Sequence, residues 1–130
     1  MAGEIAGGNK ILLAALDGED RLVGSAQLAL EPRSNGRHRA EVQKVLVLAA
    51  ARGRGIGATL MRRVEAEART RGRSLLFLDT SVGTGGAVRF YERLGYIQAG
   101  GIPGYAADPD GRLMDNAIFY KRLASGPGGG

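Results

Sequence analysis

The sequence predicts an α/β fold, and a change in hydrophobic period carries that prediction. Apolar and polar residues alternate in stretches before residue 48, as in strands, and apolar residues then recur every three or four positions, as in a helix. From residue 39 to residue 78 the order is strand, glycine-rich turn, helix and strand. Such a unit usually joins two parallel strands by a right-handed crossover, so we expect a sheet that packs against helices.

Three antiparallel strands are expected before this helix. The first two are joined by a turn at residues 17–20, where the sequence Asp-Gly-Glu-Asp suits a hairpin, and a loop at residues 32–36 precedes the third. We place these strands at residues 11–16, 22–30 and 39–48. The third is continuously apolar at residues 45–48, which predicts a buried central strand.

The helix that follows is predicted from residue 56 to a stop near Gly72. One of its faces is apolar and the other is charged, so the apolar face should pack on the sheet. The apolar positions are Ile56, Leu60, Met61, Val64 and Ala68. The charged positions are Arg62, Arg63, Glu65, Glu67 and Arg69.

The second half of the chain is predicted to continue with a buried strand at residues 74–78, closed by Asp79. A short helix at residues 86–94 should end at Gly95, which can adopt the left-handed conformation common at helix stops. The remaining elements are a strand at residues 96–99, a loop at residues 101–111 and a last strand at residues 117–120.

The length and composition bound the class of protein. A chain of 130 residues suits one compact domain, placed at residues 1–125, and the Gly- and Pro-rich tail at residues 126–130 is expected to be disordered. No apolar run reaches the roughly 20 residues that span a bilayer, and residues 1–9 lack the pattern of a secretory signal, so we expect no membrane partner. The absence of cysteine excludes disulfides, thiolate metal sites and cysteine nucleophiles, and makes a cytoplasmic location the default.

The net charge of +5 favours an anionic partner. Two arguments disfavour nucleic acid. Several arginines gather around one turn, at Arg52 and Arg54, instead of forming a long stripe, and aromatic residues, the stacking platforms of single-strand binders, make up only 5% of the chain. A phosphorylated cofactor is therefore the expected anion.

A glycine-rich turn, Arg52-Gly53-Arg54-Gly55-Ile56-Gly57, lies between a predicted strand and the first turn of a helix. Glycines allow backbone N–H groups to approach an oxyanion, and the start of a helix favours phosphate. The same turn could serve only as a tight connection. Because Ala58 and Thr59 follow, the lysine and hydroxyl residue of a nucleotide-triphosphate loop are absent, which disfavours ATP and GTP.

The turn is similar to the coenzyme-binding motif of the GNAT acetyltransferases, which is Gln or Arg, two residues, Gly, one residue, and Gly or Ala. Here Arg52, Gly55 and Gly57 meet that pattern, and a second motif of the family resembles residues 87–96. The resemblance implies the GNAT fold, a mixed and mostly antiparallel sheet around a β-α-β coenzyme-binding core. It also implies acetyl-CoA as co-substrate and no metal.

A finer resemblance is to the tabtoxin-resistance acetyltransferases, and it extends from about residue 4 to residue 123. It is carried by residues 40–44, 51–55, 78–80 and 103–105. This resemblance implies that the acceptor is the amine of a small molecule. GNAT domains normally begin with a strand and two helices that form one wall of the acceptor site, and this chain starts near the family's second strand. We therefore expect the wall to be missing or supplied by another chain, which makes a homo-oligomer an open alternative.

The resemblance also implies where the coenzyme binds. Backbone groups of Val45, Leu46 and Val47 would hold the pantetheine arm and polarise the thioester carbonyl. Thr84 occupies the place of an asparagine that often contacts this arm, and it could still donate a hydrogen bond. The pyrophosphate would be held by the amides of Arg52, Gly53, Arg54, Gly55, Ile56, Gly57 and Ala58.

Three residues are candidates for the chemistry. Tyr91 matches the tyrosine that protonates the coenzyme thiolate in many members of the family, although a tyrosine on an apolar helix face can also be core packing. Glu41 begins one strand and Asp79 ends the next, and in this fold both carboxylates could face the acceptor amine. Their structural alternatives are an ion pair with an arginine such as Arg39, for Glu41, and a loop cap, for Asp79.

Three further side chains are weaker candidates for the site. His38 is expected to be a solvated hairpin residue, and Tyr105 and Asp108 would either touch the substrate or only shape their loop. We expect an acetyl-CoA-dependent N-acetyltransferase in which a small-molecule amine attacks the thioester directly. A degenerate coenzyme-binding or regulatory domain, and an acetyltransferase that modifies proteins, are the alternatives.

Overall fold

The computed structural model describes residues 2–4, 9–82 and 86–124. The chain divides into two compact units, Met1–Leu76 with Arg122–Gly130, and Phe77–Lys121. The expectation of a single domain at residues 1–125 stays a prediction. The predicted tail at residues 126–130 lies outside the described residues.

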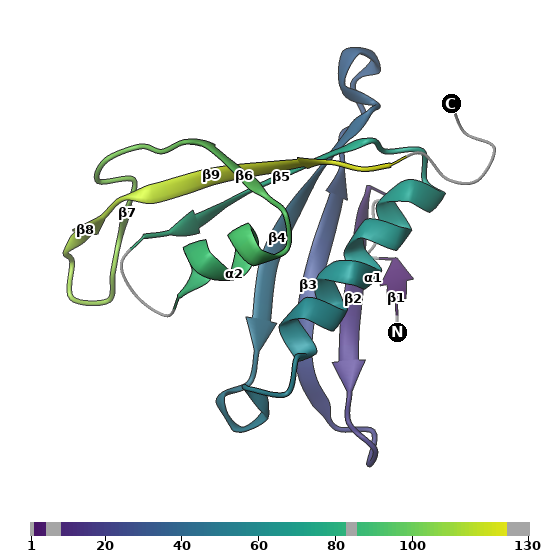
Figure 1. Ribbon diagram of the computed structural model, residues 1–130, viewed down its shortest axis with the longest axis horizontal. Helices are drawn as coiled ribbons and strands as arrows, with labels where there is room; N and C mark the ends of the chain where they lie inside the picture. The colour runs from purple at the N-terminus through teal and green to yellow at the C-terminus, as the bar shows by residue number, and fades with distance from the viewer. Residues whose placement is uncertain (1, 5–8, 83–85, 125–130) are drawn as a thin grey trace. The chain divides into compact units, whose positions relative to one another are not determined.

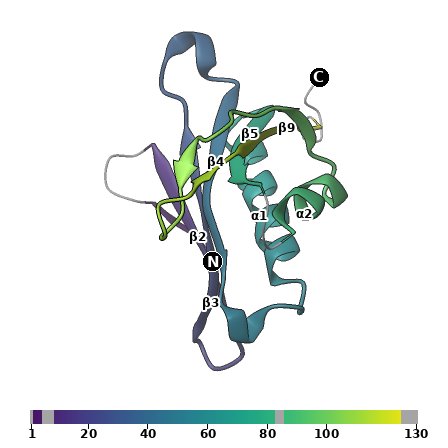
Figure 2. The same cartoon turned by 90° about the vertical axis from the view of Figure 1, so that its left-hand side faces the viewer.

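The first unit is an antiparallel set of strands with a helix on one face (Figure 1). Its strands are β1 (Ala2–Glu4), β2 (Lys10–Leu16), β3 (Leu22–Leu30) and β4 (Arg39–Val47), and each pairs with the next in sequence. Helix α1 (Ile56–Thr70) packs on β2, β3 and β4, as Figure 2 shows from a second side. The three strands predicted before the helix are confirmed, and β1 was not foreseen.

Local chemistry explains the first hairpin. The N–H of Asp17 donates to the carbonyl of Arg21 at 2.9 Å, and Asp20 adopts a left-handed φ of 62°. The backbone N–H groups of Arg21 and Glu19 both donate to the Asp17 carboxylate, and they hold the pKa of that carboxyl below its usual value. The aspartate-rich turn therefore closes the hairpin that its sequence predicts.

The core of the first unit lies between α1 and the strands. Gly24 of β3 permits the close approach, because a Cβ there would lie 3.0 Å from both the Leu46 carbonyl oxygen and the Leu60 side chain. The buried apolar side chains of this unit include Ile11, Leu13, Ala26, Leu28, Ala40, Val42, Leu60, Met61, Val64 and Ala68. Glu65 was predicted on the charged face of α1 but is only 6% exposed, and it lies 3.8 Å from Arg69. The spacing of the apolar residues predicts which face of α1 packs on the strands. How far burial extends around the helix depends on the residues that pack against it.

Strand β5 (Leu75–Ser81) starts in the first unit and continues into the second. The N–H groups of Ser74 and Leu75 both donate to the carbonyl of His38, just before β4, at 2.8 and 3.0 Å. The beginnings of β4 and β5 therefore lie side by side, which is the arrangement expected of parallel strands joined through α1. The loop between β3 and β4 is held by the Arg73 side chain, which donates to the carbonyls of Glu31 and Arg37 at 2.9 and 2.7 Å.

The second unit has the strand order β5, β9 (Asn116–Arg122), β6 (Ile97–Gly100), with β6 antiparallel to β9. It also contains helix α2 (Ala87–Arg93), which Gly95 follows with a φ of 90°, as predicted. Residues 101–111 were predicted as a plain loop, but the structure forms a small hairpin of β7 (Ala106–Ala107) and β8 (Leu113–Met114). The reason is Asp108, whose carboxylate accepts from the N–H groups of Asp110 and Arg112 at 2.9 and 2.8 Å.

Candidate active site

The glycine-rich turn has the backbone that an oxyanion site needs. Gly53 and Gly55 adopt left-handed φ values of 84° and 73°, and a Cβ on either would meet no atom within 4 Å, so the turn is open to an incoming group. Gly55 is the N-cap of α1, and the side chains of Arg52 and Arg54 are exposed beside it. Positive φ is costly for other residue types, which explains the glycines.

The start of α1 adds donors to this turn. The N–H of Thr59 bonds to the carbonyl of Gly55 at 3.0 Å, so Ile56, Gly57 and Ala58 precede the first bonded amide of the helix. Among the residues that the structure describes, no side chain caps this helix start, and its first turn contains no acidic residue. The amides and the helix dipole are therefore suited to an anion. We call residues 52–58 the phosphate loop below.

A β-bulge precedes the phosphate loop in β4. Gln43 pairs with Gln27 and Leu46 pairs with Ser25, so two residues of β4, Lys44 and Val45, stand where β3 has one. Lys44 takes a left-handed φ of 51° to accommodate the extra residue. The prediction that residues 45–48 form a buried strand is wrong in part, because alternation resumes after the bulge and leaves Leu46 59% and Leu48 52% exposed.

The bulge is followed by a strand end with one set of backbone groups turned outward. The N–H of Leu48 donates to the carbonyl of Val23 at 2.9 Å, so these two residues form a hydrogen-bonded pair of the antiparallel ladder. Hydrogen-bonded and non-hydrogen-bonded pairs alternate along such a ladder. The next pair, Gly24 with Val47, is therefore a non-hydrogen-bonded one, in which the backbone N–H and C=O groups of each residue point away from the other strand. The N–H and C=O of Val47 thus face away from β3, and its carbonyl accepts from Arg52 Nε at 3.4 Å. Val47 is the residue of the segment 45–47 whose outward backbone is clearest.

The two candidate carboxylates lie in different units and have different partners. Glu41 of β4 is half-buried in the first unit and accepts from Gln43 Nε2 at 3.0 Å. Arg39, its suggested partner, instead pairs with Glu31 at 3.4 Å. Asp79 of β5 is exposed in the second unit, and its Oδ2 accepts from Asn116 Nδ2 at 3.5 Å.

Tyr91 lies in an aromatic cluster of the second unit and is 6% exposed. Its ring packs edge-on against those of Phe90 and Tyr96, with ring centroids 5.0 and 5.8 Å away, and its centroid lies 5.9 Å from that of Phe119. Burial raises the pKa of Tyr91 to about 12 because the phenolate would be poorly solvated. The phenol therefore retains its proton at neutral pH, which a proton donor requires.

This burial predicts an alkaline loss of stability. Between pH 10 and 12 the unfolded chain releases the Tyr91 proton while the folded chain keeps it, so the free energy of unfolding should fall in that window and be unaffected by Tyr91 below it. Two pKa units correspond to about 3 kcal/mol. Urea unfolding at pH 8, 10 and 11 should show a steeper loss for the wild type than for Tyr91→Phe. If the free energy of unfolding fell equally with pH in the two proteins, the raised pKa of Tyr91 would be contradicted.

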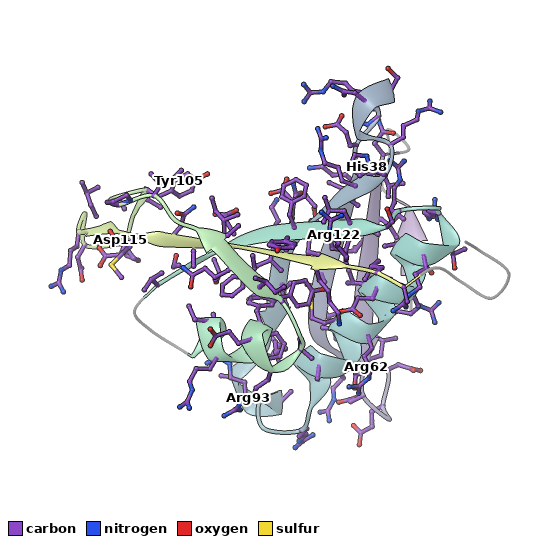
Figure 3. All side chains as sticks on the ribbon, turned by 45° about the horizontal axis from the view of Figure 1, so that its top comes forward. His38, Arg62, Arg93, Tyr105, Asp115 and Arg122 are labelled. Atoms are coloured by element: carbon purple, nitrogen blue, oxygen red, sulfur yellow. The ribbon has the colours of Figure 1, made fainter. Side chains whose placement is uncertain are left out.

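The other predicted residues divide between loop and surface. His38 lies on the exposed 31–39 hairpin (Figure 3), consistent with a solvated position. Tyr105 is 54% exposed, and Asp108 shapes the turn described above. Thr84 lies outside the described residues. Sequence reasoning missed Asn116, and the one signal that could have found it is a polar residue opening an apolar strand.

The residues that the structure describes, 2–4, 9–82 and 86–124, contain neither a metal-ligand cluster nor a membrane-spanning helix. No group of three or more His, Cys, Asp or Glu side chains that could hold a metal ion occurs there. None of the helices in that part of the chain has the length and apolar character needed to cross a membrane.

The chain is similar to known acetyltransferases in sequence and in fold. It is 35% identical over 78 residues to an IAA acetyltransferase of Azospirillum brasilense, a match that covers 60% of this chain and about half (51%) of that protein. The structure of a ribosomal-protein-alanine N-acetyltransferase from Brucella melitensis matches with a TM-score of 0.76 and 29% identity, over 88% of this chain and 69% of that one. A candidate acetyltransferase from Salmonella typhimurium, solved with its cofactor acetyl-CoA, matches with a TM-score of 0.78 and 21% identity, over 91% and 67% of the two chains.

A family model settles the relationship. The model described as the acetyltransferase (GNAT) family matches residues 4–96, which include β4, the bulge, the phosphate loop, α1, β5 and α2. The predicted fold class, with a mostly antiparallel mixed sheet and two α-helices, is confirmed. The chain belongs to the GNAT family of acetyltransferases.

Proposed function

We propose that this acetyltransferase moves the acetyl group of acetyl-CoA onto the amine of a small molecule. The observation that carries the proposal is the phosphate loop, in which open amides at the start of α1 adjoin two left-handed glycines and two exposed arginines. These features fit the pyrophosphate of coenzyme A, since no side chain fills the space above Gly53 and Gly55. The outward backbone of Val47 suits the amide groups of a pantetheine arm, with Val45 and Leu46 beside it.

When bound, acetyl-CoA would supply the acetyl group as an activated thioester. As the new C–N bond forms and the C–S bond breaks, three proton transfers are needed. The ammonium loses one proton before attack, the acylated nitrogen loses a second afterwards, to the same carboxylates or to water, and the departing sulfur gains one. An aliphatic ammonium has a pKa near 10 and must lose a proton before it can attack, and the exposed Asp79 carboxylate can first attract this cation and then accept its proton, directly or through a water. Glu41 is a second acceptor in the proposal. Tyr91 holds its phenolic proton at neutral pH and can donate it to the departing sulfur.

Thiol release from acetyl-CoA across a panel of acceptors tests this proposal. The panel should contain aliphatic amines, amino acids and β-lactam-containing amines, the last because residues 40–44 and 103–105 resemble the tabtoxin-resistance enzymes. Peptides with an N-terminal alanine should be included, since one similar structure is that of a ribosomal-protein-alanine N-acetyltransferase. Release only with peptides would establish a protein acetyltransferase, and binding of acetyl-CoA without release would establish a degenerate domain.

Light scattering on the active preparation tests the alternative of a homo-oligomer. If a second copy supplies part of the acceptor wall, turnover should appear only in fractions larger than one chain. Full activity of a dilute monomer would rule this arrangement out.

The carboxylates give a further prediction. Asp79→Asn and Glu41→Gln keep the shape of each side chain and remove its charge, so each should lower turnover by roughly 10²-fold with little change in acetyl-CoA binding. A double variant that loses less than the sum of the singles would indicate that both serve the same proton. Asp110→Asn, an exposed aspartate on the second unit's hairpin, is the matched control and should keep full activity. Wild-type rates and pH profiles in both single variants would mean that the carboxylates are structural.

A further inference from the structure

Asn116 is a buried polar side chain of the second unit with no role in the function proposed above. It is the first residue of β9 and is 6% exposed. A buried amide is costly unless its donor and acceptor atoms find partners. The partners that Asn116 finds are therefore informative.

Two neighbours fix the orientation of this amide. Asn116 Oδ1 accepts from the backbone N–H of Ile102 at 2.6 Å, and Nδ2 donates to Asp79 Oδ2 at 3.5 Å. A backbone N–H can only donate, and an ionised carboxylate can only accept, so the reversed amide would lose both bonds. The Ile102 contact therefore aims the NH₂ group at Asp79.

Asn116 also links the loop at residues 101–105, which comes after β6, to strand β9. The backbone N–H of Asn116 donates to the Ile102 carbonyl at 3.2 Å, which makes a two-way link with that residue. Gly101 permits the close approach, because a Cβ there would collide with the carbonyl oxygen of Asn116. The adjacent Asp115 provides a second anchor, since its Oδ1 accepts from the N–H of Gly104 at 2.9 Å.

Asp115 and Asn116 thus hold the same loop, but of the two only Asn116 has a bond to the Asp79 side chain among the described contacts of the second unit. The backbone carbonyl of Asp115 accepts from the N–H of Val82 at 2.9 Å, which keeps the end of β5 beside the start of β9. Tyr105, next along the loop, is exposed, and Figure 3 shows it in the same region of the second unit as Asp115. Asn116 therefore contacts both this loop and the Asp79 carboxylate.

We propose that Asn116 is a positioning residue that orients the Asp79 carboxylate. The proposal rests on the function assigned to Asp79 above. A carboxylate on an exposed strand end would otherwise sample several rotamers, and catalysis by a base depends on holding it within reach of the proton that it accepts. Asn116 would act through Asp79 without touching the substrate.

The first test requires no activity. The NMR resonances of the Asn116 side-chain NH₂ should move when Asp79→Asn is made, because this substitution removes the carboxylate that accepts from Nδ2. The exposed Asn35 side chain serves as the reference and should not respond to Asp79→Asn. An Asn116 resonance that ignores Asp79→Asn would overturn the proposal, and this arm holds even if variants of Asn116 fail to fold.

The second test uses turnover. Asn116→Asp keeps an acceptor for the Ile102 N–H but replaces the donor that faces Asp79 with a like charge. We expect kcat/KM to fall about 10-fold while acetyl-CoA affinity is unchanged, and we expect no further loss when the substitution is made in an Asp79→Asn background. An equal loss in both backgrounds would mean that Asn116 does not act through Asp79.

Asp115→Ala is the matched control, because it removes the other anchor of the loop and leaves the Asn116 to Asp79 contact intact. Its kcat/KM should stay close to the wild type. A loss as large as that of Asn116→Asp would show that the effect travels through loop anchoring alone and would overturn the proposal. If the wild type releases no thiol with any acceptor, the proposed function fails, and the NMR arm still decides whether Asn116 holds Asp79.

Discussion

Gly55→Asp is expected to abolish the thermal stabilisation that acetyl-CoA gives to the wild type. A ligand that binds only the folded state at 100 times its Kd stabilises that state by about 2.7 kcal/mol, which corresponds to a rise in Tm of roughly 10 °C in a domain of this size. The substitution places a carboxylate at the N-cap of α1, where the open amides and arginines would otherwise meet a pyrophosphate. Thermal melts with and without acetyl-CoA measure the effect.

The same helix offers a matched control for backbone strain. Gly72, just past the other end of α1, has a φ of 76° against 73° for Gly55, and a Cβ at either position meets no atom within 4 Å. Gly72→Asp should therefore lower Tm through the same strain and keep the full shift with acetyl-CoA. If folded Gly55→Asp is still stabilised as strongly as Gly72→Asp, the phosphate loop does not bind the coenzyme.

Tyr91→Phe is expected to lower turnover by roughly 10²-fold, the range usual for loss of a general acid. The phenylalanine ring still fills the aromatic cluster, so stability at neutral pH and acetyl-CoA affinity should change little. Single-turnover rates, in which chemistry is limiting, are the measurement.

Tyr96→Phe controls for the removal of a buried hydroxyl. Tyr96 is 3% exposed and packs edge-on against Tyr91, but the proposal gives it no proton to donate. Its turnover should match the wild type. A Tyr91→Phe variant that also turns over normally would show that water or another group protonates the sulfur.

Features of the fold that depend on neighbours in sequence could be predicted. Leu60, Val64 and Ala68 recur at helical spacing, and all three are buried on α1. Gly95 marks the end of α2, as expected of a left-handed stop. The glycine-rich turn has the left-handed glycines and the uncapped helix start that its sequence predicts, because both features are set within a few residues.

Features of the fold that depend on a partner far away in the sequence could not be predicted. The bulge at Lys44 exists only relative to β3, and it reverses which of residues 45–48 face solvent. The burial of Glu65 likewise depends on what packs around α1, which helical period alone does not specify.

The sequence by itself determined the class of fold and the position of the glycine-rich turn, and it nominated Tyr91, Asp79 and Glu41 as candidates. Tertiary structure alone decided their surroundings: the aromatic cluster that raises the pKa of Tyr91, and the amide of Asn116 that meets Asp79 across 37 positions of the chain. The physical reason is range. Periodicity, turn chemistry and helix stops arise from residues within about one helical turn, whereas burial and side-chain hydrogen bonds form only after strands far apart in sequence have paired.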